Sequence, residues 1–281
     1  MKVQIQPLSR GLFTASGGTR VSVKRDRPWQ TDIVVDKSKC PFETTPQVQV
    51  ASYDFPVGHW KLLENMHTPF SWHRLIIPST CWAKEQIRIL GGQESIATAL
   101  RIALEAMHAE SGEFWLGVHV GPSAGQNTSH LHYHLLKPFN RPSQSSSGRT
   151  LIEHISSSPL ILFEDEGYRV VLGGYRAGQC FISPTEKACF GYKEAEGLAR
   201  VLARLVDLYN KKFERPHEDE RLRFPPDYIL SAKFLVPTLI YVTYIPILNN
   251  WGFTEYLGLM EERPLILPWP HEESLRYLKE P

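Results

Sequence analysis

The stretch of residues 124–136 decides the fold, and it reads AGQNTSHLHYHLL. In its second half His130, His132 and His134 alternate with apolar residues. Side chains of a strand point alternately to its two faces. A strand over 129–136 would therefore place the three histidines on one face and the apolar side chains in the core. We predict that the histidines line a surface or cleft beside the preceding turn.

Imidazole changes its charge near neutral pH, so a row of three can supply a nucleophile, a donor to a phosphate oxygen and an acid for a leaving group. An imidazole that attacks phosphorus needs an acceptor for the proton on its far nitrogen and donors for the phosphate charge. The same alternation is also typical of a polar strand face, and three neutral imidazoles on one face are good zinc ligands. The alternation alone leaves these three interpretations open.

The residues upstream of the histidines favour the phosphate chemistry. The turn Gly121–Gln126 leads into the histidines, and residues 65–78 read NMHTPFSWHRLIIP. Together the two segments resemble the histidine-triad superfamily, whose signature is an A/G-G-Q turn, a short spacer and alternating histidines. The superfamily also has a strand–turn segment with a histidine before a proline, which His73 and Pro78 match. The resemblance covers about residues 58–139.

The resemblance implies a role for each matching histidine. His132 is similar to the nucleophile that forms a covalent nucleotidyl-histidine. His130 and His134 match the histidines that flank this nucleophile and support the site. His73 matches a further histidine near the phosphates.

The resemblance also implies a substrate-binding loop. Gly125, Gln126 and Asn127 match the phosphate-binding turn, whose backbone N–H groups form an anion-binding concavity. Asn65 falls where the family places an aspartate or asparagine near the nucleotide ribose. Two positions depart from the family pattern, because His119 replaces the usual asparagine and Asn127 the usual serine or threonine. Both residues still form hydrogen bonds, so catalysis remains compatible with them.

A metal site follows from the resemblance to the two-half branch that contains galactose-1-phosphate uridylyltransferase. Residues 40–43 read CPFE and are similar to the C-P-F-C segment of that branch. The implied ligands are Cys40, Glu43, Cys81 and His130, all of types that bind zinc. The alternative is that both cysteines are buried free thiols. Zinc is thus a candidate cofactor, and we expect no organic cofactor.

The order of predicted elements occurs twice. Residues 60–78 and 168–184 can be superimposed with a small gap, and an amphipathic helix is predicted after each, over 95–109 and 194–211. We predict an α+β fold in which an antiparallel sheet with helices is built from two related halves. The expected divisions are N-terminal strands and turns over 1–45, a catalytic half over 46–140, a linker over 141–165 and a second half without the histidines over 166–281.

Composition restricts the partners. The net charge is +1 with balanced signs, so we expect neither a nucleic-acid nor a membrane partner. Four scattered cysteines and the lack of a secretory segment favour the cytoplasm, with the thiols free or metal-bound. A homodimer is an expectation from the resemblance.

The expected function is nucleotidyl transfer at a phosphoanhydride, by a nucleotidyltransferase or a dinucleoside polyphosphate phosphorylase. The substrate would be a nucleotide, a nucleotide sugar or a dinucleoside polyphosphate. His134 favours a hydrolase instead, because the transferase branch usually carries glutamine there. A catalytically idle nucleotide- or metal-binding protein is a third hypothesis, which the changes at His119 and Asn127 motivate.

Overall fold

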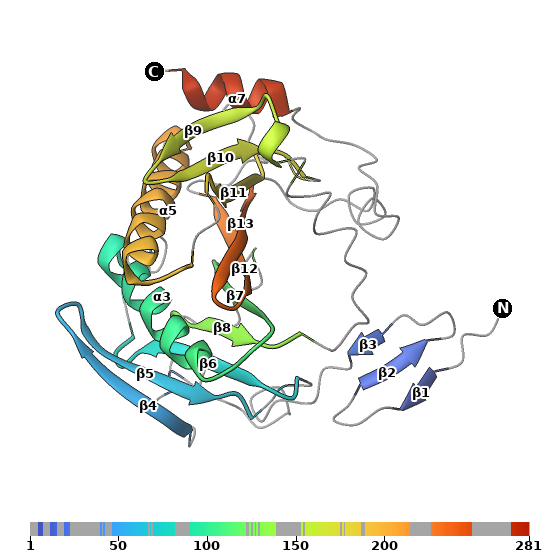
Figure 1. Ribbon diagram of the computed structural model, residues 1–281, viewed down its shortest axis with the longest axis vertical. Coiled ribbons are helices and arrows are strands. Elements are labelled where there is room, and N and C mark those ends of the chain that lie inside the picture. Colours follow the sequence, from blue (N-terminus) through green and yellow to red (C-terminus); the bar gives the residue numbers. More distant parts are fainter. Residues whose placement is uncertain are drawn as a thin grey trace.

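A ten-stranded antiparallel sheet forms the centre of the computed structural model (Figure 1). The structure describes residues 5–7, 12–15, 20–22, 40, 42, 47–66, 68, 70–81, 90–121, 124, 126, 128, 130–138, 153, 155–174, 176, 178–186, 189–213, 226–248 and 271–280. Strands β1 (Ile5–Pro7), β2 (Leu12–Ala15) and β3 (Arg20–Ser22) make a separate three-stranded antiparallel sheet.

Two halves contribute five strands each to the large sheet. The first half contains β4 (Val48–Phe55), β5 (Gly58–Glu64), β6 (His73–Pro78), α3 (Gln93–His108), β7 (Glu113–Val120) and β8 (Tyr133–Leu136). The second contains β9 (Ile161–Asp165), β10 (Tyr168–Leu172), β11 (Cys180–Pro184), α5 (Tyr192–Lys212), β12 (Asp227–Leu235) and β13 (Thr238–Ile247). A last helix, α7 (His271–Lys279), packs against β9, β10 and α5.

The strand order reads the same from both edges. It runs β4-β5-β6-β8-β7 in the first half and continues β12-β13-β11-β10-β9 in the second. The register repeats as well, because Trp60 pairs with Pro78 and Tyr168 pairs with Pro184. The prediction of an α+β fold with two related halves is therefore confirmed, and the halves meet where β7 pairs with β12.

Helices α3 and α5 lie side by side against one face of the sheet (Figure 1). Each buries an apolar stripe that recurs every three or four residues, as expected for an amphipathic helix. The stripes include Ile96, Leu100, Ala103 and Met107 on α3 and Leu198, Leu202, Leu205 and Tyr209 on α5. Both stripes join one hydrophobic core with the sheet, and each large buried side chain contributes about 1.5–3 kcal/mol. The opposite face of the sheet is left to carry the polar side chains described below.

One sequence-based boundary is wrong. The linker was expected to extend over 141–165, but β9 occupies Ile161–Asp165 and pairs with β10. Ile155 is also fully buried. The apolar run from Leu160 to Phe163 supplies a strand, because an antiparallel partner follows directly after a tight turn. Among the described residues, no helix combines the length and apolar character needed to cross a bilayer.

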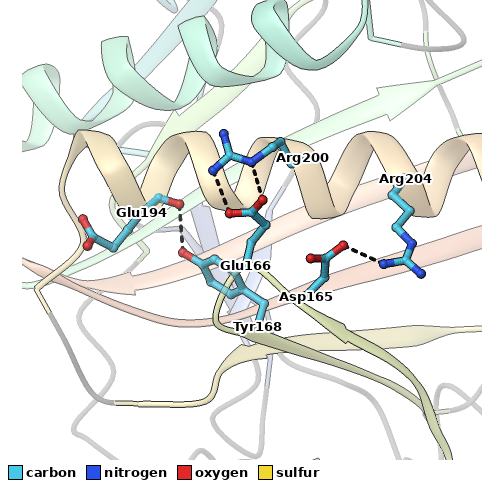
Figure 2. Close-up of polar contacts among 6 residues, drawn as sticks. All are labelled: Asp165, Glu166, Tyr168, Glu194, Arg200 and Arg204. Carbon is cyan, nitrogen blue, oxygen red and sulfur yellow. Dashed lines mark hydrogen bonds and ion pairs between the residues drawn. The ribbon is translucent and has the colours of Figure 1, made fainter.

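The turn between β9 and β10 is tied to α5 by charged side chains (Figure 2). The Arg200 guanidinium donates two hydrogen bonds of 2.7 Å to the Glu166 carboxylate, and Arg204 donates one of 2.6 Å to Asp165. The Tyr168 hydroxyl donates to the backbone carbonyl of Glu194 at 2.9 Å. The hydrogen bonds from Arg200 lower the pKa of Glu166 below its ordinary value of 4.5. The ionised carboxylate is therefore the form that the folded protein favours.

We predict that Arg200→Leu destabilises the protein at pH 7 and has less effect in acid. A carboxyl group whose pKa is lowered by folding contributes stability above its unfolded pKa and loses it as the pH falls through the folded value. The free energy of unfolding should therefore differ most between wild type and Arg200→Leu above pH 4.5. Urea denaturation at several pH values between 7 and 3.5 measures this difference. A difference that does not shrink below pH 4.5 would contradict the prediction.

Candidate active site

The histidine stretch is only partly a strand. Regular pairing in β8 begins at Tyr133, so the strand expected over 129–136 starts four residues later than predicted. The apolar residues of the stretch are buried as expected, and His132 and His134 are half-buried. His130 differs, because only 1% of it is exposed. His130 therefore lies inside the protein, whereas the sequence predicted that all three histidines line a surface or cleft.

His130 is turned inward by two kinds of contact. Its Nε2 lies 2.7 Å from the backbone carbonyl of Pro78, which can only accept a hydrogen bond. Nε2 therefore carries the proton, and Nδ1 presents a lone pair. Both Cys40 Sγ and Cys81 Sγ lie 3.0 Å from this Nδ1. One lone pair cannot accept a proton from two thiols at once, so the arrangement fits a shared metal ion better than a hydrogen-bonded pair.

Cys40, Cys81 and His130 are the sequence-predicted ligands that the structure brings together. Their ligand atoms lie within 4.8 Å of one another, so this cluster is able to hold a metal ion. Glu43, the fourth predicted ligand, lies outside the described residues. Within the described part of the chain, the candidate metal cluster includes neither His132 nor His134. The interpretation of the three alternating histidines as one metal site is therefore not supported.

His132 has the tautomer that a nucleophile needs. Its Nδ1 lies 2.8 Å from the backbone carbonyl of His130, so the proton is on Nδ1 and the lone pair is on Nε2. The ring of Phe42 lies 5.5 Å from the His132 ring and 5.1 Å from the His130 ring, measured between centroids. Phe42 thereby packs against both imidazoles and helps to fix their orientation.

His73 and His134 form one hydrogen-bonded pair across β6 and β8. His73 Nε2 lies 3.0 Å from His134 Nδ1, and the Thr68 hydroxyl lies 2.7 Å from His73 Nδ1. The amide nitrogen of Asn65 lies 3.3 Å from the same Nδ1. The rings of His132 and His134 lie 4.9 Å apart between centroids. A continuous polar chain thus leads from Thr68 through His73 and His134 to the nucleophile candidate.

The glycine turn lies beside this chain. His119 on β7 donates from Nδ1 to the carbonyl of Ala124 at 2.5 Å, and its ring lies 6.5 Å from that of His134. The side-chain oxygen of Gln126 accepts from the backbone N–H of Gly121 at 2.7 Å, so its amide nitrogen keeps two protons for other acceptors. Gly125 and Asn127 lie outside the described residues. His119 and Gln126 are therefore brought to the site as predicted from the sequence.

Two threonines were missed as contributors to the site. Thr68 Oγ1 accepts from the backbone N–H of Phe70 at 3.2 Å, and Thr128 Oγ1 accepts from that of His130 at 3.1 Å. Both hydroxyls therefore make the same local turn, in which a threonine accepts from the residue two positions later. The sequence did contain a signal for both contributions, because Thr68 and Thr128 each precede a predicted site histidine, His73 and His130, by a few residues.

Comparison with known proteins gives matches in structure. No family model matches the chain, and no curated protein matches it. A uridylyltransferase mutant superimposes with a TM-score of 0.67 at 11% identity, over 93% of this chain and 94% of the other. An ADP-glucose phosphorylase from Arabidopsis thaliana with bound ADP-glucose superimposes with a TM-score of 0.64 at 15% identity, over 86% and 90%. A GalT-like protein from Arabidopsis thaliana superimposes with a TM-score of 0.64 at 15% identity, over 86% of this chain and 91% of the other.

The chain has the two-half histidine-triad fold. The resemblance seen in the sequence is thereby confirmed for the architecture. In the first half, the described residues between β7 and β8 are Gly121, Ala124, Gln126, Thr128 and those over 130–132, which include His130 and His132. In the second half, residues 236–237 connect the equivalent strands β12 and β13. Among the described residues, the histidines of the candidate site thus come from the first half, although the fold is duplicated.

We predict that Thr68→Val alters the protonation pattern of both His73 and His134. Valine keeps the shape of the side chain but removes the hydroxyl that bonds His73 Nδ1. The ring ¹⁵N chemical shifts of both histidines, which report the tautomer, should change together. Thr68→Ser, which retains the hydroxyl, should give spectra like those of the wild type. His59, which bonds Asp54 on the edge of the sheet, serves as an internal reference. Unchanged ring signals in Thr68→Val would contradict the hydrogen-bonded chain.

Proposed function

We propose that this chain transfers a nucleotidyl group from a phosphoanhydride substrate through a covalent intermediate on His132. The observation that carries the proposal is the 2.8 Å hydrogen bond from His132 Nδ1 to the carbonyl of His130. It holds the proton away from Nε2, which is left as the attacking atom. It also stabilises the positive charge that develops on the ring as Nε2 bonds to phosphorus.

The reaction takes two displacements at one phosphorus. In the first, the Nε2 lone pair forms a P–N bond while the bond from phosphorus to the leaving phosphate oxygen breaks, and its electrons leave with that oxygen. In the second, an acceptor oxygen attacks phosphorus and the P–N bond breaks, which restores neutral His132. His134 lies beside His132, His73 and His119 lie next to His134, and Gln126 belongs to the adjoining turn; these side chains would meet the charge of the phosphate oxygens.

We assign catalysis to the half over 46–140 and a supporting role to the half over 166–281. The described histidines of the site come from the first half, and the second half pairs with it through β7 and β12. The fold neighbour that was solved with bound ADP-glucose supports a nucleotide sugar or another nucleoside diphosphate derivative as substrate. Phosphate or a sugar phosphate is then the expected acceptor.

Hydrolysis is the second candidate, and His134 is the observation that favours it. His134 belongs to a chain of hydrogen-bonding side chains that is able to hold or release a proton, which an attacking water molecule requires. The two functions differ in whether product formation depends on added phosphate or sugar phosphate.

We predict that His132→Ala abolishes turnover and that His132→Gly regains part of it with free imidazole. The wild type would be incubated with nucleotide sugars and dinucleoside polyphosphates, with and without phosphate, and its peptides searched for a nucleotide mass adduct on His132. His59→Ala is the control, because His59 is a partly exposed histidine bonded to Asp54 outside the site. Full activity of His132→Ala would refute the nucleophile assignment. Nucleotide binding without any adduct or turnover would support an idle binding protein.

We further propose that the cluster of Cys40, Cys81 and His130 holds zinc, with Glu43 as the fourth ligand. The chemistry of the donors fits, because two sulfur atoms and one imidazole nitrogen converge and Pro78 fixes the proton of His130 on the opposite side. Zinc that is fully ligated by protein would stabilise the fold locally. Because the His132 proton is held by the His130 carbonyl, ordering His130 also orders the nucleophile.

Protein prepared without chelators should contain stoichiometric zinc by elemental analysis. Cys81→Ser should lose most of the zinc and lower the midpoint of thermal unfolding, because one of the converging ligand atoms is weakened. Cys189→Ser is the matched control, since Cys189 is exposed and is not part of the cluster. Absence of stoichiometric zinc from the wild type would refute this assignment and leave the nucleophile assignment untouched.

A further inference from the structure

A carboxylate from the second half occupies the space above a glycine of the first half. Asp227, the first residue of β12, is only 6% exposed. A Cβ atom built on Gly121 would lie 2.0 Å from Asp227 Oδ1 and 2.1 Å from its Cγ. The backbone of Gly121 also has φ +92°, a conformation that residues with side chains rarely adopt. The glycine and the carboxylate are therefore fitted to each other.

Gly121 is the residue on which the glycine turn closes. Its carbonyl accepts from the backbone N–H groups of Ala124 and Gln126, each at 3.2 Å. Its own N–H donates to the Gln126 side chain at 2.7 Å. A displacement of Gly121 would therefore move both the turn and Gln126, which lie beside the histidines.

The antiparallel register explains why Asp227 reaches this place. Val120 pairs with Tyr228 at the end of β7, so the next residues along, Gly121 and Asp227, face each other across the junction of the two halves. Asp227 also lies on the same face of the sheet as His119, because the neighbouring pair Val120 and Tyr228 points into the core.

We propose that Asp227 is a positioning residue for the substrate phosphate. Its carboxylate holds Gly121 in place and thereby keeps the turn and Gln126 aligned with Nε2 of His132. The proposal rests on the proposed nucleotidyl transfer. It gives the second half, which lacks the histidines, a defined part in the reaction.

The second half offers a matched control. Gln179 is also 6% exposed, and its side chain fills the space above a glycine with positive φ, Gly174. Gln179 is at the position in the second half that is equivalent to His73 in the first. The backbone carbonyl of Gln179 accepts from the N–H of Gly173 at 3.0 Å, and that of His73 accepts from the N–H of Asn65 at 3.0 Å. Removing either side chain should leave a comparable gap, but only the gap at Asp227 adjoins the proposed site.

The experiment compares Asp227→Ala, Asp227→Asn and Gln179→Ala with the wild type. The rate of nucleotide adduct formation on His132 is measured in parallel with the midpoint of thermal unfolding. We expect Asp227→Ala to slow adduct formation at least about tenfold, since small misplacements of a substrate have effects of this size or larger. Asp227→Asn, which keeps the shape, should stay within about threefold of the wild type. Gln179→Ala should also stay within that range, although it lowers the unfolding midpoint about as much as Asp227→Ala does.

A double variant tests the contact itself. Gly121→Ala should slow adduct formation because the new Cβ collides with the carboxylate. Asp227→Ala removes the carboxylate with which the new Cβ collides. In that background Gly121→Ala should therefore slow adduct formation by a clearly smaller factor than it does in the wild type. Equal effects in both backgrounds would overturn the proposed contact.

The remaining outcomes separate this proposal from the proposed function. The positioning role would be overturned if Asp227→Ala formed the adduct at a rate within about threefold of the wild type. It would also be overturned if Gln179→Ala formed the adduct as slowly as Asp227→Ala. If Asp227→Asn formed the adduct as slowly as Asp227→Ala, the shape of the Asp227 side chain would not be what holds Gly121 in place. If the wild type forms no adduct, the proposed function fails, and AMP binding measured by calorimetry replaces the rate. Weaker AMP binding in Asp227→Ala alone would then support the positioning role, and equal binding in all variants would overturn it.

Discussion

The pairing of β7 with β12 is the constraint on which the rest of the molecule depends. Eight residues of each strand are in register, from Val120 opposite Tyr228 to Glu113 opposite Leu235. This pairing makes one continuous sheet from two related halves and lets α3 and α5 share a single core. It also fixes which end of the second half meets the glycine turn of the first. Because register is set by the buried face, a slip of one residue would turn every core side chain of β12 toward solvent.

The candidate active site is organised by backbone carbonyls as much as by side chains. The carbonyl of Pro78 sets the tautomer of His130, and the carbonyl of His130 sets that of His132. In His130 the lone pair on Nδ1 faces the two thiols, and in His132 the lone pair is on Nε2. A peptide carbonyl can only accept a hydrogen bond, so each of these contacts places a proton on the ring nitrogen that faces the carbonyl.

Much of the fold followed from local patterns, and much of the site did not. Alternation correctly predicted that Leu131, Tyr133 and Leu135 are buried, because a strand has a period of two. The same alternation did not predict that His130 is buried, because its contacts with Pro78 and Cys40 join residues far apart in the sequence. Cys40, Cys81 and His130 were grouped correctly only through a family resemblance. Asp227 gave no signal at all, because its importance depends on a strand register between two halves.

The connection between β12 and β13 over residues 236–237 makes the two ends of the central strand pair β7–β12 different. This turn lies at the start of β7, where Val236 donates to the carbonyl of Gly112 at 3.1 Å. The corresponding connection in the first half, between β7 and β8, includes Gly121, Gln126, His130 and His132. It begins at the opposite end of the strand pair β7–β12. The two ends of the pair β7–β12 therefore differ, although the halves are related. Within the part of the chain that the structure describes, the proposed site lies at one end of the pair β7–β12, so the proposed labelling of His132 would saturate at one equivalent per chain despite the internal symmetry.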